Sequence, residues 1–138
     1  MKLLVGSVFT SHKKQKNFYD LQIKFLKKTT KDFHHIVFIN GKSEYYFKHS
    51  ETIGNHLDYQ TIGLSKSHSL GMDSIIQFFR EHPADNYLLL DSDCFPILNN
   101  WQEILLSKMH EKKFAAPVRF ENLETFRSEE HTSELQSH

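Results

Sequence analysis

Three apolar runs of strand length most constrain what this chain can fold into. They span Lys2–Phe9, His35–Ile39 and Asn86–Leu90, and they are continuous rather than strictly alternating with polar residues. Continuous runs of this length are typical of strands buried on both faces, as in a parallel sheet. Because helix-like segments separate them, the order predicts an α/β fold with a largely parallel sheet and helices on its faces.

The segments between these runs carry helix signals. Between Lys13 and Lys28, apolar residues recur on one side and lysines fill much of the other, which predicts an amphipathic helix with Ser11 as its N-cap. Gly71–Arg80 has the i, i+3, i+4, i+7 apolar spacing of a second helix. Asn100 and Glu103 have capping-box spacing at the start of a third helix.

Weaker patterns predict three further strands. Two short ones are expected at Tyr45–Lys48 and Tyr59–Leu64, and a last one at Phe114–Val118. With these additions the predicted order remains that of an α/β sheet, without internal repeats.

The last twelve residues, 127–138, do not continue this pattern. Their sequence, RSEEHTSELQSH, resembles the translation of a common sequencing adapter over its whole length. We therefore expect residues 1–126 to form one partial, truncated domain and residues 127–138 to be a non-native artefactual tail. A natural polar tail is the alternative interpretation.

Composition excludes several classes of protein. The 138 residues suit one domain or part of one, and 17 basic residues balance 17 acidic ones, which argues against a nucleic-acid partner. One cysteine excludes an internal disulfide framework. No apolar run approaches the ~20 residues that span a bilayer, so no membrane segment is expected in this fragment. We expect a cytoplasmic location, with membrane association only through a missing C-terminal part.

The strongest chemical signal follows the third apolar run. Asp91 and Asp93 stand at its carboxyl end, where ligands bind in open α/β sheets. Two neighbouring carboxylates can be stabilised by a divalent cation, and Mg²⁺ and Mn²⁺ prefer oxygen ligands. The alternative is structural, with Asp91 capping a turn and Asp93 solvated. Cys94, which follows the pair, is expected to pack rather than to react.

Around this motif, residues 2–120 resemble the N-terminal, nucleotide-sugar-binding part of a GT-A-type, family-2-like glycosyltransferase. Asp91-Ser92-Asp93 resembles the Asp-x-Asp motif of that family. The resemblance implies a Rossmann-like, GT-A-like fold and a nucleoside diphosphate sugar, expected to be a UDP-sugar. It also implies Mn²⁺ or Mg²⁺ at Asp91 and Asp93, which would stabilise the diphosphate leaving group.

The same resemblance implies further nucleotide-site residues at strand ends and within Ser65–Met72, the segment before the second predicted helix. Asn40 stands where many family members carry an aspartate that contacts the base; an asparagine can still pair with a uracil edge. The residues expected around the nucleotide are Thr10, Ser11, Asn40, Lys66, His68, Asp91, Ser92 and Asp93.

Two other functions compete with this hypothesis. Leu88–Asp93 also resembles the nucleophile strand of haloacid-dehalogenase-like phosphatases, in which the first aspartate attacks phosphate and the second acts as acid and base. The chain could otherwise be a non-catalytic nucleotide-binding or unstable fragment. In the glycosyltransferase hypothesis, the acceptor and the catalytic base are not identified, and the truncated chain alone is expected to be inactive.

Overall fold

A computed structural model describes residues 2–41, 47–54 and 62–109 of the chain. The chain divides into two compact units, residues 1–99 and 100–138. The second unit contains α4 (Trp101–Met109), which begins after Asn100 as predicted. The elements of the first unit are β1 (Leu3–Thr10), α1 (Lys13–Thr29), β2 (Phe33–Asn40), β3 (Glu51–Thr52), α3 (Leu64–Glu81) and β4 (Asn86–Leu89).

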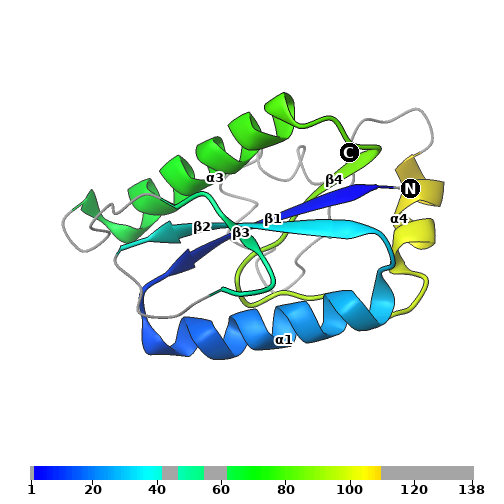
Figure 1. Cartoon of the computed structure of the whole chain (residues 1–138), viewed down its shortest axis with the longest axis horizontal. Coiled ribbons are helices and arrows are strands. Elements are labelled where there is room, and N and C mark those ends of the chain that lie inside the picture. Colours follow the sequence, from blue (N-terminus) through cyan, green and yellow to red (C-terminus); the bar gives the residue numbers. More distant parts are fainter. Residues whose placement is uncertain (1, 42–46, 55–61, 110–138) are drawn as a thin grey trace, which may run out of the picture. The chain divides into compact units, whose positions relative to one another are not determined.

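The strands form one parallel sheet in the order β3-β2-β1-β4 (Figure 1). β1 and β2 pair along their whole length, from Leu3 opposite Phe33 to Thr10 opposite Asn40. The carboxyl ends of these two central strands therefore meet at one edge of the sheet. The predicted α/β class, with a Rossmann-like parallel sheet, is confirmed.

The two faces of the sheet carry separate hydrophobic clusters, because successive strand residues point to opposite sides. α3 packs on one face and α1 on the other (Figure 1). The cluster under α3 contains Leu4, Val8, Ile36, Phe38, Ile75 and Phe79. The cluster under α1 contains Phe9, Tyr19, Ile23, Val37 and Phe47. The two central strands, β1 and β2, are thus mostly buried between two helices, as their continuous apolar runs predicted.

Several predicted boundaries were wrong. α3 begins at Leu64 rather than Gly71, so the last residue of the strand expected at Tyr59–Leu64 is helical, and residues 59–61 of that strand fall outside the described residues. The N-cap of α1 is His12 rather than Ser11, because the Nδ1 atom of His12 accepts the backbone N–H of Lys14. Phe47 and Lys48 lie in no strand, and the rest of the strand expected at 45–48 falls outside the described residues.

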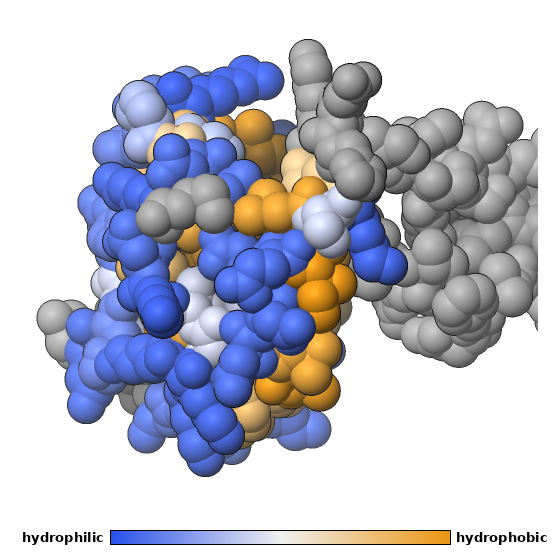
Figure 2. All heavy atoms as spheres, turned by 90° about the vertical axis from the view of Figure 1, so that its right-hand side faces the viewer, coloured by the Kyte–Doolittle hydropathy of each residue, from blue (hydrophilic) through white to orange (hydrophobic). Residues whose placement is uncertain are grey.

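β4 differs from the fully buried strand that its sequence predicts. Within the described sheet it pairs only with β1, and Tyr87 and Leu89 remain 45% and 40% exposed. Figure 2 looks toward the amino ends of the strands and shows a mostly hydrophilic surface with an apolar band along one side. The strand predicted at Phe114–Val118 and the tail at 127–138 lie outside the described residues.

Candidate functional site

A pocket of about 330 Å³ lies at the carboxyl edge of the sheet. Its walls come from the ends of β1 and β2, the start of α1, the first turns of α3 and the turn that follows β4. This volume suits a small-molecule site, and the carboxyl edge of a parallel sheet is where such sites form. The lining residues are Val8, Thr10, Gln15, Asn40, Leu64, Ser65, Ser67, His68 and Ser92.

Asn40, the last residue of β2, is the feature of this pocket that most clearly points to a ligand. Its side chain is 1% exposed, and its Nδ2 atom donates to the backbone oxygen of Ser67 at 2.9 Å. This bond orients the amide and leaves the buried Oδ1 atom without a donor among the described residues. A buried acceptor without a partner costs free energy, so an N–H or O–H donor that reaches this atom, from water or from a ligand, would stabilise it.

The end of β1 contributes Thr10, which lines the pocket as expected. Its backbone N–H donates to Oε1 of Gln15 at 3.3 Å, which fixes the beginning of α1 beside the strand end. Ser11 does not line the pocket; its backbone N–H instead donates to the backbone oxygen of Asn40 at 3.1 Å. Ser11 therefore joins the ends of the two central strands rather than offering its hydroxyl to the pocket.

The first turns of α3 form another wall. Leu64, Ser65, Ser67 and His68 line the pocket, whereas Lys66 is exposed outside that lining. The first turn of α3 carries no acidic residue. The backbone N–H groups that begin a helix have no partners within it and favour negative charge, so this wall suits an anion.

The Asp-x-Asp motif forms a turn directly after β4. The backbone N–H of Cys94 donates to the backbone oxygen of Asp91 at 3.0 Å and closes this turn. Ser92 lines the pocket, while the Asp91 and Asp93 side chains are exposed beside it. The prediction that Cys94 packs was wrong, since its side chain is exposed and its Sγ atom lies 3.7 Å from Oδ1 of Asp93.

The donor atoms of this turn lie close enough together that they could hold a metal ion. One oxygen each of Asp91 and Asp93 and the Sγ atom of Cys94 lie within 4.8 Å of one another. Two carboxylates match the oxygen ligands that Mg²⁺ and Mn²⁺ prefer, and the thiol adds a softer donor beside them. Exposure keeps the carboxylates solvated, so the turn does not require a metal to be stable.

Sequence reasoning missed Gln22, which connects this turn to the core. Gln22 lies on the buried face of α1, and its Nε2 atom donates to the backbone oxygens of Asp91 and Cys94 at 3.1 and 2.9 Å. A signal was present: Gln22 is a polar residue one helical turn after Tyr19, within the apolar stripe of the helix.

Comparisons with protein-family models, curated proteins and solved structures found no match to this chain. Among the residues that the structure describes, no helix is both long and apolar enough to cross a membrane.

Proposed function

We propose that this chain binds the nucleoside diphosphate part of a sugar donor, with UDP-sugar as the expected donor, and forms the donor-binding part of a metal-assisted glycosyltransferase. One observation carries this proposal: a single pocket is lined both by Asn40, whose buried Oδ1 atom has no donor among the described residues, and by Ser92, which lies between two exposed carboxylates. The first feature suits a base or a sugar hydroxyl, and the second suits a metal-bound diphosphate.

In this proposal, each residue of the site contacts a different part of the nucleoside diphosphate. Oδ1 of Asn40 would accept the imide N–H of a uracil, and the hydroxyl of Thr10 would contact the nucleoside. The amino-terminal N–H groups of α3 would face the negative phosphates. Asp91 and Asp93 would hold Mn²⁺ or Mg²⁺, which when bound neutralises charge that develops on a diphosphate leaving group. We assign no catalytic base and no acceptor site to the described residues.

The direct test is calorimetric titration of the full 138-residue chain with UDP, with and without Mn²⁺, on a sample whose fold has been checked by circular dichroism. We expect binding that requires the metal. Asp93→Asn should weaken metal-dependent UDP binding by at least about tenfold, or 1.4 kcal/mol, because it removes one anionic ligand. UMP, which lacks the second phosphate, should bind more weakly and depend less on the metal.

The matched control is Asp73→Asn, which changes an exposed aspartate of α3 that does not line the pocket. It should leave UDP binding unchanged. A folded chain that binds no UDP in the presence of Mn²⁺ would contradict the proposal. If that chain instead hydrolysed p-nitrophenyl phosphate, and Asp91→Asn abolished the hydrolysis, the phosphatase hypothesis would replace it.

A further inference from the structure

Gln22 links α1 to the Asp91–Cys94 turn through the Nε2 atom of its amide group. The residue is 0% exposed. Its Nε2 atom carries two N–H groups and faces two backbone oxygens, those of Asp91 and Cys94. These oxygens belong to the first and last residues of the turn, so one side chain holds both ends of the segment that bears the two carboxylates.

The orientation of this amide is determined by its neighbours. Its Oε1 atom lies 3.0 Å from Oγ of Ser7 and 2.7 Å from Nε2 of His35. Exchanging the oxygen and nitrogen atoms would place Oε1 against two backbone oxygens that cannot donate, so only one assignment satisfies every contact. Nε2 of His35 must then carry a proton and donate it to Gln22.

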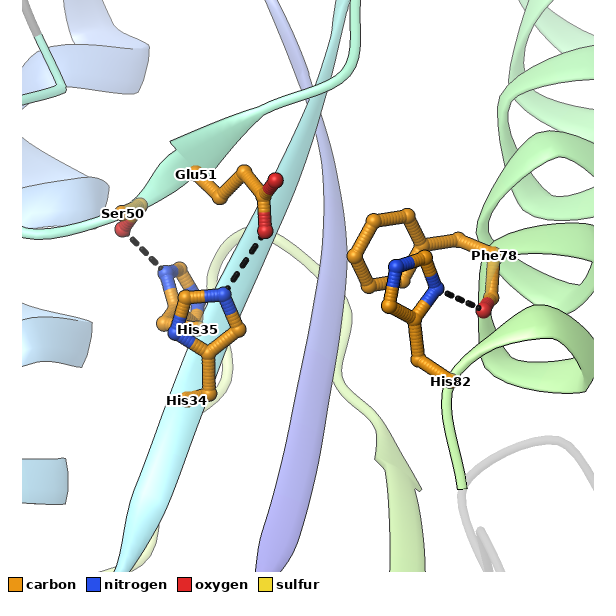
Figure 3. A network of polar contacts seen from close by, with 6 residues as sticks. All are labelled: His34, His35, Ser50, Glu51, Phe78 and His82. Atoms are coloured by element: carbon orange, nitrogen blue, oxygen red, sulfur yellow. Dashed lines mark hydrogen bonds and ion pairs between the residues drawn. The ribbon is translucent and has the colours of Figure 1, made fainter. Parts of the chain in front are cut away.

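The donor and acceptor roles of the next hydrogen bonds follow from this protonation of His35. Since Nε2 of His35 is a donor in the neutral ring, Nδ1 is an acceptor and receives the hydroxyl proton of Ser50 (Figure 3). The hydroxyl of Tyr19 lies 2.8 Å from Oγ of Ser50 and accepts the backbone N–H of His49 at 3.1 Å. A buried chain of hydrogen bonds thus fixes the amide that holds the turn.

We infer that Gln22 is a positioning residue for the Asp-x-Asp carboxylates, acting through the backbone of their turn. The inference rests on the proposed function for its metal and nucleotide role. The carboxylates themselves are exposed, so their relative position depends on the backbone of the turn. A second contact joins α1 to Phe95, the residue after the turn: the ring of Phe25 stacks on that of Phe95 with a centroid separation of 4.6 Å.

Gln22→Met tests this role, because methionine has a similar length but no N–H groups. Two measurements are made on the full chain: Mn²⁺ affinity by electron paramagnetic resonance, and the rate at which a disulfide reagent modifies Cys94, the chain's one cysteine, without metal. We expect Mn²⁺ affinity to fall by about tenfold or more, as when a residue supporting a metal ligand is lost. The Cys94 rate should rise by about threefold or more as the turn opens more often.

The matched control is Tyr19→Phe, which removes a hydroxyl from the same buried chain of hydrogen bonds, one turn earlier on α1, where it contacts Ser50 and the backbone of His49. It should destabilise the fold but change both measurements by less than about twofold. Equal changes in the two variants would assign Gln22 a merely structural role and overturn the inference.

Failure of the proposed metal role and failure of the positioning role of Gln22 give different experimental results. If the wild-type chain binds no Mn²⁺, the metal role in the proposed function is lost, but the Cys94 rates still compare Gln22→Met with Tyr19→Phe. If Gln22→Met does not fold, hydrogen exchange in the wild-type chain decides. Slow exchange of both side-chain N–H hydrogens of Gln22 supports its role in holding the Asp91–Cys94 turn, and rapid exchange overturns that role.

Discussion

Acidification from pH 6.5 toward pH 3 should destabilise the folded chain by up to about 5 kcal/mol through His35 alone. The side chain of His35 is 1% exposed. Burial, with a smaller contribution from neighbouring His34, lowers the pKa of His35 from 6.5 to about 3. Between these two values the unfolded chain takes up a proton that the folded chain does not. The stabilising contribution is therefore complete above pH 6.5 and is lost as the pH falls toward 3.

The measurement is urea unfolding of the chain at several pH values between 7 and 4. His35 should contribute a slope of about 1.4 kcal/mol per pH unit below pH 6.5. His35→Gln should be less stable at pH 7, because it loses the ring that joins Gln22 to Ser50, but it should lack this part of the slope.

His34→Gln is the matched control. His34 is the adjacent histidine, half exposed, and its ring contacts Glu51 at 2.8 Å on the surface (Figure 3). This variant should retain most of the acid slope. An unchanged slope in His35→Gln would show that other groups cause the acid sensitivity.

The elements that could be predicted from the sequence are those whose side chains enter the core. β1 and β2 lie within two residues of their predicted ends, and α1 within one, because their apolar patterns record burial directly. α3 was predicted to begin late since its first two turns, from Leu64 to Leu70, are mostly polar. Those turns line the pocket rather than the core, so the helical apolar period is absent there. β3 has only two exposed residues and exists through its pairing with Ile36 and Val37.

Those residues of the candidate site that lie at or above the ends of strands could be predicted from the sequence. Thr10, Asn40, His68 and Ser92 line one pocket, as expected of residues at or above the carboxyl edge of a parallel sheet. The position of Lys66 outside that lining depends on the rotation of α3, which no pattern in the first two turns reveals. The link from Gln22 to Asp91 and Cys94 joins residues 69 and 72 positions apart, which only the folded topology brings together.

Gly6→Ala should destabilise the fold by about 3 kcal/mol, because α3 lies against β1 where Gly6 has no side chain. A Cβ atom at Gly6 would lie 2.3 Å from Cγ2 of Ile75 and 3.1 Å from Cζ of Phe79. Ile75 is fully buried, so it cannot move away without disturbing the cluster under α3. Urea unfolding followed by circular dichroism measures the loss. A cost below about 0.5 kcal/mol, the range of a harmless surface change, would mean that α3 can shift to make room.

Gly63→Ala is the control for Gly6→Ala, because it introduces backbone strain without steric crowding by the described residues. A Cβ atom there would meet no described residue within 4 Å, but Gly63 has φ of 90° and ψ of 150°, so alanine should cost about 1 to 3 kcal/mol through backbone strain alone. Ile75→Ala supplies the decisive comparison, since it removes the Cγ2 atom nearest to the new methyl group. Gly6→Ala should then cost at least about 1 kcal/mol less in the Ile75→Ala background than in the wild-type chain. Equal costs in both backgrounds would place the strain in β1 itself rather than in its contact with α3.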